Sequence, residues 1–120
     1  MDDLIAFLNA RLDEDETAAN AATQGPWQAG ETPGNRKTMI PCIFVAYGTA
    51  RPDAGHVLYE ADYGTPADVA CIARHDPARV LREVAAKRAI LASHSVTWTV
   101  VEQLAAVYSY HPDYRAEWKP

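Results

Sequence analysis

The stretch that decides the fold is Asp68-Val-Ala-Cys-Ile-Ala-Arg-His-Asp-Pro-Ala-Arg-Val-Leu-Arg-Glu-Val84. It predicts a short helix, a two-residue break and a long helix. His75 ends the first helix, Asp76 is a favourable cap for the second, and Pro77 suits a first helical turn. These polar residues therefore have an architectural explanation. No comparable stretch of the chain indicates a reaction.

Working outward, helices are expected on both sides of this stretch. Leu4, Leu8 and Leu12 recur at helical spacing, so residues 2 to about 22 are predicted to form an N-terminal helix that Gly25-Pro26 ends. Three later helices are predicted at about 66–74 with Thr65 as cap, 77–93 and 96–109.

Residues 27–64 lose the helical period. The segments Thr38–Tyr47 and His56–Tyr63 are rich in β-branched and aromatic residues, which favour strands. The turns are expected at 34–35 and 51–55. We expect an antiparallel meander of two or three strands, and therefore an α+β fold with three helices and an aromatic tail after the meander.

Composition describes an ordinary globular protein. The 120 residues are 48% hydrophobic and 22% charged, which predicts a single domain spanning 1–120. No apolar run approaches the length of a membrane helix. The N-terminus is acidic where a secretory signal would be basic, and a cytoplasmic location is expected. The formal charge of −5 disfavours nonspecific nucleic-acid binding.

Cys71 and His75 stand four residues apart on a predicted helix and therefore share one face of it. A metal site would need a second close pair of ligands, which the sequence lacks, so neither metal nor cofactor is expected. A catalytic thiol would need a third residue to orient the histidine, and no such residue stands near Cys71 and His75 in the sequence. A small enzyme using Cys71 and His75 is the third alternative.

Arg88 falls inside the apolar arc of the long helix, and Asp15 falls inside that of the N-terminal helix. A guanidinium at the edge of a core needs a planar acceptor or must extend its head to water. We expect Arg88 to form a structural ion pair with a carboxylate, with Asp15 as the first candidate and Asp68 or Asp62 next.

The helix, break and helix also resemble a helix-turn-helix. In that reading Arg79, Arg82 and Lys87 would contact nucleic acid. The acidic chain lacks the positive electrostatic potential that DNA binding requires, so a small DNA-binding regulator is the second alternative.

Aromatic and apolar residues concentrate toward the C-terminus. They are hard to bury together in a small domain, and aromatic residues are favoured at protein interfaces. The candidate interface comprises Trp98, Val101, Tyr108, Tyr110, Tyr114 and Trp118.

Three patches carry a family resemblance. They are Ile72-Ala-Arg-His-Asp-Pro-Ala-Arg-Val-Leu-Arg-Glu-Val84, the segment Leu12–Glu16 with Gly25-Pro-Trp27, and Tyr110-His-Pro-Asp-Tyr-Arg115. The chain resembles a family of small actinobacterial and phage-borne proteins of unknown function. The resemblance implies a fold and a setting but no activity.

The function expected from the sequence is that of a non-catalytic accessory or protein-binding module. It would act through its C-terminal helix and aromatic tail, as a homodimer or with another protein.

Overall fold

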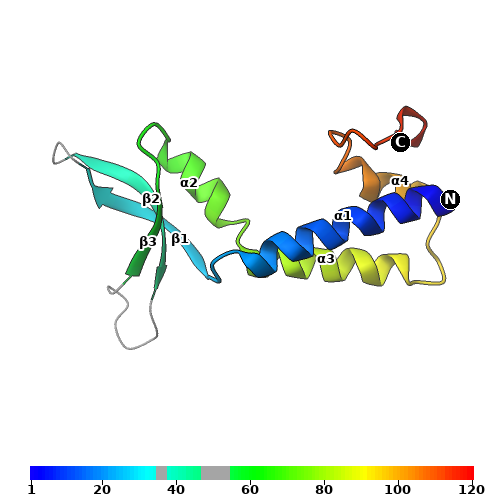
Figure 1. Ribbon diagram of the computed structural model, residues 1–120, viewed down its shortest axis with the longest axis horizontal. Helices are drawn as coiled ribbons and strands as arrows, with labels where there is room; N and C mark the ends of the chain where they lie inside the picture. Colours follow the sequence, from blue (N-terminus) through cyan, green and yellow to red (C-terminus); the bar gives the residue numbers. More distant parts are fainter. Residues whose placement is uncertain (35–37, 47–54) are drawn as a thin grey trace. The chain divides into compact units, whose positions relative to one another are not determined.

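The computed structural model describes residues 1–34, 38–46 and 55–120. Within these residues the chain forms four α-helices, three β-strands and one short 3-10 helix. Figure 1 labels the α-helices and the strands. The predicted α+β fold, with an N-terminal helix, a meander and then helices, is confirmed. The predicted turns at 34–35 and 51–55 lie partly or largely outside the described residues.

The elements follow one another in simple order. They are α1 (Asp2–Ala21), β1 (Trp27–Pro33), β2 (Met39–Ala46), β3 (Gly55–Glu60), α2 (Pro66–Ala73), α3 (Pro77–Leu91), α4 (Trp98–Ala106) and η1 (Ala116–Trp118). No helix among the described residues is both long enough and apolar enough to cross a membrane.

The chain divides into two compact units. The helical unit comprises residues 1–18 and 81–120, and the sheet unit comprises residues 19–80. Helices α1 and α3 each contribute residues to both units. The two units are described separately below.

The core of the helical unit forms along α1 because Leu4, Leu8 and Leu12 repeat every four residues and are fully buried. Val84 of α3 is buried in the same unit. Helix α4 contributes a seam with the spacing i, i+4, i+7: Val101, Ala105 and Tyr108.

The core of the sheet unit joins the sheet to α2. The sheet is antiparallel with the order β1-β2-β3. Ile43 of β2, Ala61 and Val69 of α2 are buried together, and Trp27 and Leu58 pack against them. Apolar burial on one face therefore fixes the sheet against α2.

The starts of α2 and α3 are capped by side chains, among them Thr65 and Asp76, which the sequence predicts as caps. Thr65 and Asp68 form a capping box, in which the Thr65 hydroxyl accepts from the Asp68 N–H and the Asp68 carboxylate accepts from the Thr65 N–H. Asp76 accepts from the N–H of Arg79 at 3.0 Å and so caps α3. Its other carboxylate oxygen lies 3.3 Å from the Trp27 backbone nitrogen, which ties the cap to the start of β1.

Candidate functional site

An accessible apolar surface of the sheet unit lies where the cover of α2 ends. Helix α2 packs mainly against β1 and β2 (Figure 1). Ile43 on β2 is buried, whereas its cross-strand neighbour Tyr59 on β3 is 56% exposed. Ile72 on α2 is also exposed. The apolar face of the sheet is thus covered by α2 at β2 and exposed to solvent at β3.

A cavity of about 420 Å³ occupies this open region. It is called the β3 groove here, and its lining residues are Thr23, Trp27, Ile43, Leu58, Tyr59 and Ile72. The Trp27 indole is fixed in place because its Nε1–H donates to the Thr23 carbonyl at 2.7 Å. The Trp27 side of the groove is therefore preorganised to receive an apolar group.

A β-bulge shapes the groove. The β2–β3 register shifts between Ile43 and Phe44, so that Tyr59 pairs with Ile43, Val57 pairs with Phe44, and Leu58 has no partner of its own. Successive residues of a regular strand point to opposite faces. The bulge breaks that alternation, and Leu58 and Tyr59 both line the groove.

The groove also adjoins a strand edge. Since β3 is the last strand in the order β1-β2-β3, its outer edge has no strand partner among the described residues. Such an edge presents backbone N–H and C=O groups to which another extended segment can bind. A partner segment could then place a side chain in the groove while its backbone pairs with β3.

The His75 ring contacts the backbone of Cys71 at the end of α2. The His75 Nδ1 lies 2.7 Å from the carbonyl oxygen of Cys71, so the ring nitrogen donates to the backbone at the end of α2. Cys71 is a free, exposed cysteine. No group of three or more metal-ligating side chains occurs within the described part of the chain.

The three residues proposed for nucleic-acid contact differ in their surroundings. Arg79 donates from Nη1 to the carbonyl of Arg74 at 3.1 Å, which binds it to the end of α2. The Lys87 ammonium lies 5.3 Å from the centroid of the Tyr108 ring, a cation–π distance. Arg82 is exposed. Two of the three cations thus have local structural contacts.

Arg88 forms an ion pair, but with other carboxylates than the one expected. Its Nη2 lies 2.6 Å from Asp13, and its Nη1 donates to Glu16. These hydrogen bonds, the Glu16 bond above all, raise the pKa of Arg88. Asp15 instead accepts from the Tyr108 hydroxyl at 2.6 Å. Asp13 and Glu16 lie three residues apart and so share a side of α1 that Asp15 does not.

The predicted C-terminal interface is largely inside the helical unit. Val101, Tyr108 and Trp118 are buried. Trp98 and Tyr110 are exposed, and Tyr114 is half-buried. The buried three fill a core that α1 shares, so they cannot form an outer contact surface without unfolding.

The aromatic tail packs on α1. The Trp118 ring lies 5.2 Å from the ring of Phe7, centroid to centroid, and the Tyr114 hydroxyl donates to the Trp118 carbonyl at 3.0 Å. The Arg115 guanidinium lies 4.9 Å from the Trp118 ring centroid and pairs with Asp3 at 3.2 Å. Stacking and charge both fix the end of the chain to the first helix.

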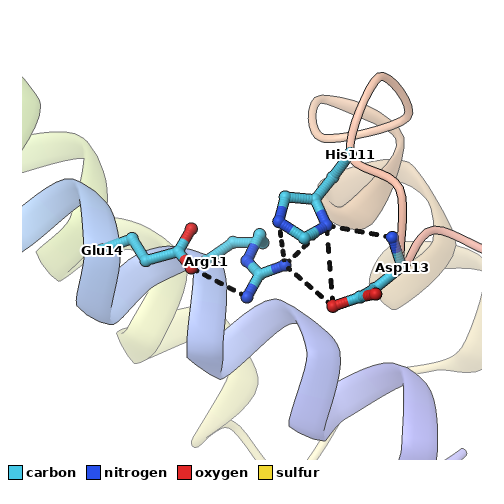
Figure 2. Close-up of polar contacts among 4 residues, drawn as sticks. All are labelled: Arg11, Glu14, His111 and Asp113. Atoms are coloured by element: carbon cyan, nitrogen blue, oxygen red, sulfur yellow. Dashed lines mark hydrogen bonds and ion pairs between the residues drawn. The ribbon is translucent and has the colours of Figure 1, made fainter.

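A polar cluster that the sequence did not indicate joins the same two segments (Figure 2). Arg11 is buried, its Nη1 lies 2.7 Å from His111 Nδ1, and its Nη2 donates to Glu14 at 2.9 Å. The Asp113 backbone N–H also donates to His111 Nδ1, at 3.1 Å. Because Arg11 can only donate, His111 serves as acceptor, and the cluster holds the tail on α1. One signal existed: Arg11 stands four residues after the apolar Phe7 and so shares its face.

The β3 groove was also missed by sequence reasoning. The consecutive apolar residues Val57-Leu58-Tyr59 break strand alternation, and this irregularity is the signal that could have indicated a bulge. No pattern in the sequence indicates how much of the sheet α2 covers.

The comparison with family models gives a match over residues 1–120, to a family of unknown function (DUF6221). No curated protein and no solved structure matches the chain.

Proposed function

Since the chain belongs to DUF6221, a family of unknown function, we propose a function from its own surface: it is a non-catalytic protein-binding module. The single observation that carries the proposal is the β3 groove, a cavity of about 420 Å³ with an apolar lining beside an unpaired strand edge of the described sheet. The occupant is an extended segment of a partner protein, with one apolar side chain in the groove.

The physical argument combines two sources of affinity. Burying a Leu- or Phe-sized side chain contributes about 1.5–3 kcal/mol. Backbone pairing with β3 supplies hydrogen bonds and fixes the direction of the segment, as in other cases of strand addition. The groove lies open beside the strand edge rather than closed around a small molecule, which favours a peptide.

Peptide display tests this proposal. Random nine-residue peptides are selected on the intact protein, and the Kd of each enriched peptide is measured by calorimetry. Ile72→Asp introduces a charge into the groove and is expected to weaken binding at least tenfold, which corresponds to about 1.4 kcal/mol. The matched control is Ile90→Asp on α3, because Ile72 and Ile90 have similar exposed fractions of 44% and 40%.

Circular dichroism of both variants establishes that each is folded before affinities are compared. Peptides that bind the wild type and Ile90→Asp equally, and Ile72→Asp at least tenfold more weakly, support the proposal. If no peptide is enriched, or if enriched peptides bind Ile72→Asp as well as the wild type, the proposal is refuted.

A second contact surface is proposed on α4, where the homodimer expected from the sequence would form. Exposed residues form one stripe: Val100 and Gln103 at helical spacing on α4, Val107 at its C-cap and Tyr110 in the turn that follows. The stripe carries no charge, so two copies of it do not repel one another. A symmetric dimer requires such a self-complementary patch.

The setting of the protein is also a proposal. We infer an actinobacterial or phage-borne origin and a cytoplasmic location. The support is the Ile72–Val84 and Tyr110–Arg115 motifs for the origin and the two free cysteines, Cys42 and Cys71, for the location.

A further inference from the structure

A second hollow adjoins the β3 groove and differs from it in charge. Its volume is about 310 Å³, and it shares Tyr59 and Ile72 with the groove. Its remaining lining residues are Glu60, Ala61, Asp62, Tyr63, Gly64, Asp68 and Val69. The two hollows are adjacent because they share these residues, and the lining of the first is apolar whereas that of the second is acidic.

Three of the residues that line the acidic hollow are acidic, and none is basic. Asp68 already accepts from the Thr65 N–H at 2.8 Å as part of the capping box. Glu60 and Asp62 are exposed and form no ion pair with any residue that the structure describes. Two carboxylates are therefore available to a cationic group.

Tyr63 adds an aromatic ring to this end of the surface. It is fully exposed, and it belongs to the same lining as Glu60 and Asp62. A Lys or Arg side chain that reaches the carboxylates can also stack on such a ring. Charge and aromatic surface thus favour the same class of side chain.

We propose that the β3 groove binds an extended segment carrying an apolar residue and a Lys or Arg two positions away from it. This rests on the proposed function. In an extended segment, residues two apart point to the same side and lie roughly 7 Å from one another. That spacing lets one side chain enter the apolar groove while the other reaches the acidic hollow.

The direction of the segment follows from the direction of β3. The strand runs from the apolar residues Leu58 and Tyr59 toward Glu60 at its end. An antiparallel segment runs the opposite way, so its basic residue comes before its apolar residue. A parallel segment has the reverse order. Antiparallel pairing is expected because β3 pairs with β2 in that way.

The test uses the peptides enriched by display. Each peptide is synthesised with its basic residue intact, replaced by Gln and replaced by Glu, and the Kd is measured at 0.05 and 0.5 M NaCl. We expect the basic peptide to bind about three- to fivefold tighter than the Gln peptide at low salt, as for exposed ion pairs. The preference should shrink at high salt.

A pair of charge variants locates the effect. Glu60→Gln combined with Asp62→Asn should abolish the preference for the basic peptide. The control, Asp2→Asn combined with Glu117→Gln, removes the same number of charges from exposed positions in the helical unit and should keep it.

The outcomes separate the two proposals. If enriched peptides require Ile72 but bind equally well with Lys or with Gln, the charge preference is refuted and the proposed function stands. If the charge control also loses the preference, the acidic hollow is not its source and the inference fails. If no peptide is enriched, both proposals fail.

Discussion

At the scale of the residue, Tyr108 shows how burial and a hydrogen bond together shift the pKa of a side chain. Its ring is buried, and its hydroxyl donates to Asp15 at 2.6 Å. Burial raises the pKa of Tyr108, and the Asp15 carboxylate raises it further. The neutral phenol is therefore the form that the folded helical unit stabilises.

This pKa shift makes stability fall at alkaline pH. A tyrosine in the unfolded chain ionises near about pH 10. Above that pH the unfolded state loses the proton that folded Tyr108 keeps, so the free energy of unfolding decreases by up to about 1.4 kcal/mol per pH unit. Below it, the contribution is fully present.

Tyr108→Phe should remove this alkaline loss. We expect the free energy of unfolding, measured by urea at pH 8 and pH 11, to fall by about 1.4 kcal/mol less in the variant than in the wild type. At pH 8 the variant should already be about 1 kcal/mol less stable, because Asp15 loses its donor. Tyr110→Phe, at an exposed position, is the control. Equal alkaline losses in the wild type and Tyr108→Phe would contradict the explanation.

The same residues show how far the sequence could predict local contacts. Periodicity placed Arg88 and Asp15 on the inner sides of their helices, and both form partnered contacts there. Their pairing depends on which helix packs against which side of α1. Periodicity carries no such information, so Asp15 faces Tyr108 while Asp13 and Glu16 face Arg88.

At the scale of the element, helix α2 depends on its first turn. It has only eight residues, from Pro66 to Ala73, and an isolated helix of that length is not stable in water. The capping box of Thr65 and Asp68 satisfies two backbone N–H groups that would otherwise lack partners. The cap and the packing of Val69 together hold α2 on the sheet.

Thr65→Ala is expected to reduce the free energy of unfolding by about 1 kcal/mol, a usual cost of losing an N-cap. Thr65→Ser keeps the hydroxyl and should retain most of that stability. Urea unfolding of the three proteins under one buffer condition provides the comparison. An alanine variant as stable as the wild type would mean that the cap contributes nothing measurable.

The elements were predicted best where a residue acts on its own stretch of backbone, as caps and prolines do. Caps and prolines located α2 and the start of α3, and the leucine repeat located α1. Strand β1 was not delimited, because Trp27–Pro33 contains Gly30 and few β-branched residues. Its pairing with β2 stabilises it, and that pairing is a tertiary effect that overrides weak local preference.

At the scale of the whole molecule, the proposed self-association through α4 has a direct test. Val107 is 58% exposed on the stripe of Val100, Gln103 and Tyr110. Val107→Asp places like charges opposite each other in a symmetric dimer, which would shift the protein to monomers. Light scattering at two concentrations measures the mass in solution. Ile90→Asp, on α3 and 40% exposed, is the control, and a wild type that is monomeric at both concentrations would refute self-association.

The burial of the aromatic residues is a property of the whole helical unit. Counting aromatic residues suggested that too many lay near the C-terminus to be buried. Phe7 and the other α1 residues provide the missing surface, since Trp118 and Tyr114 both pack on Phe7. The contact joins segments more than 100 residues apart, which is why local reasoning assigned it to an outside partner.

The two cysteines differ in accessibility, and this gives the chain a built-in labelling position. Cys42 is buried on β2, and burial, with Glu60 and Glu31 nearby, raises the pKa of its thiol, which lowers its reactivity. Cys71 is exposed and is the immediate neighbour of Ile72 in the groove lining. A maleimide fluorophore should therefore attach to Cys71 of the unmodified sequence, where its emission would report when the groove is filled.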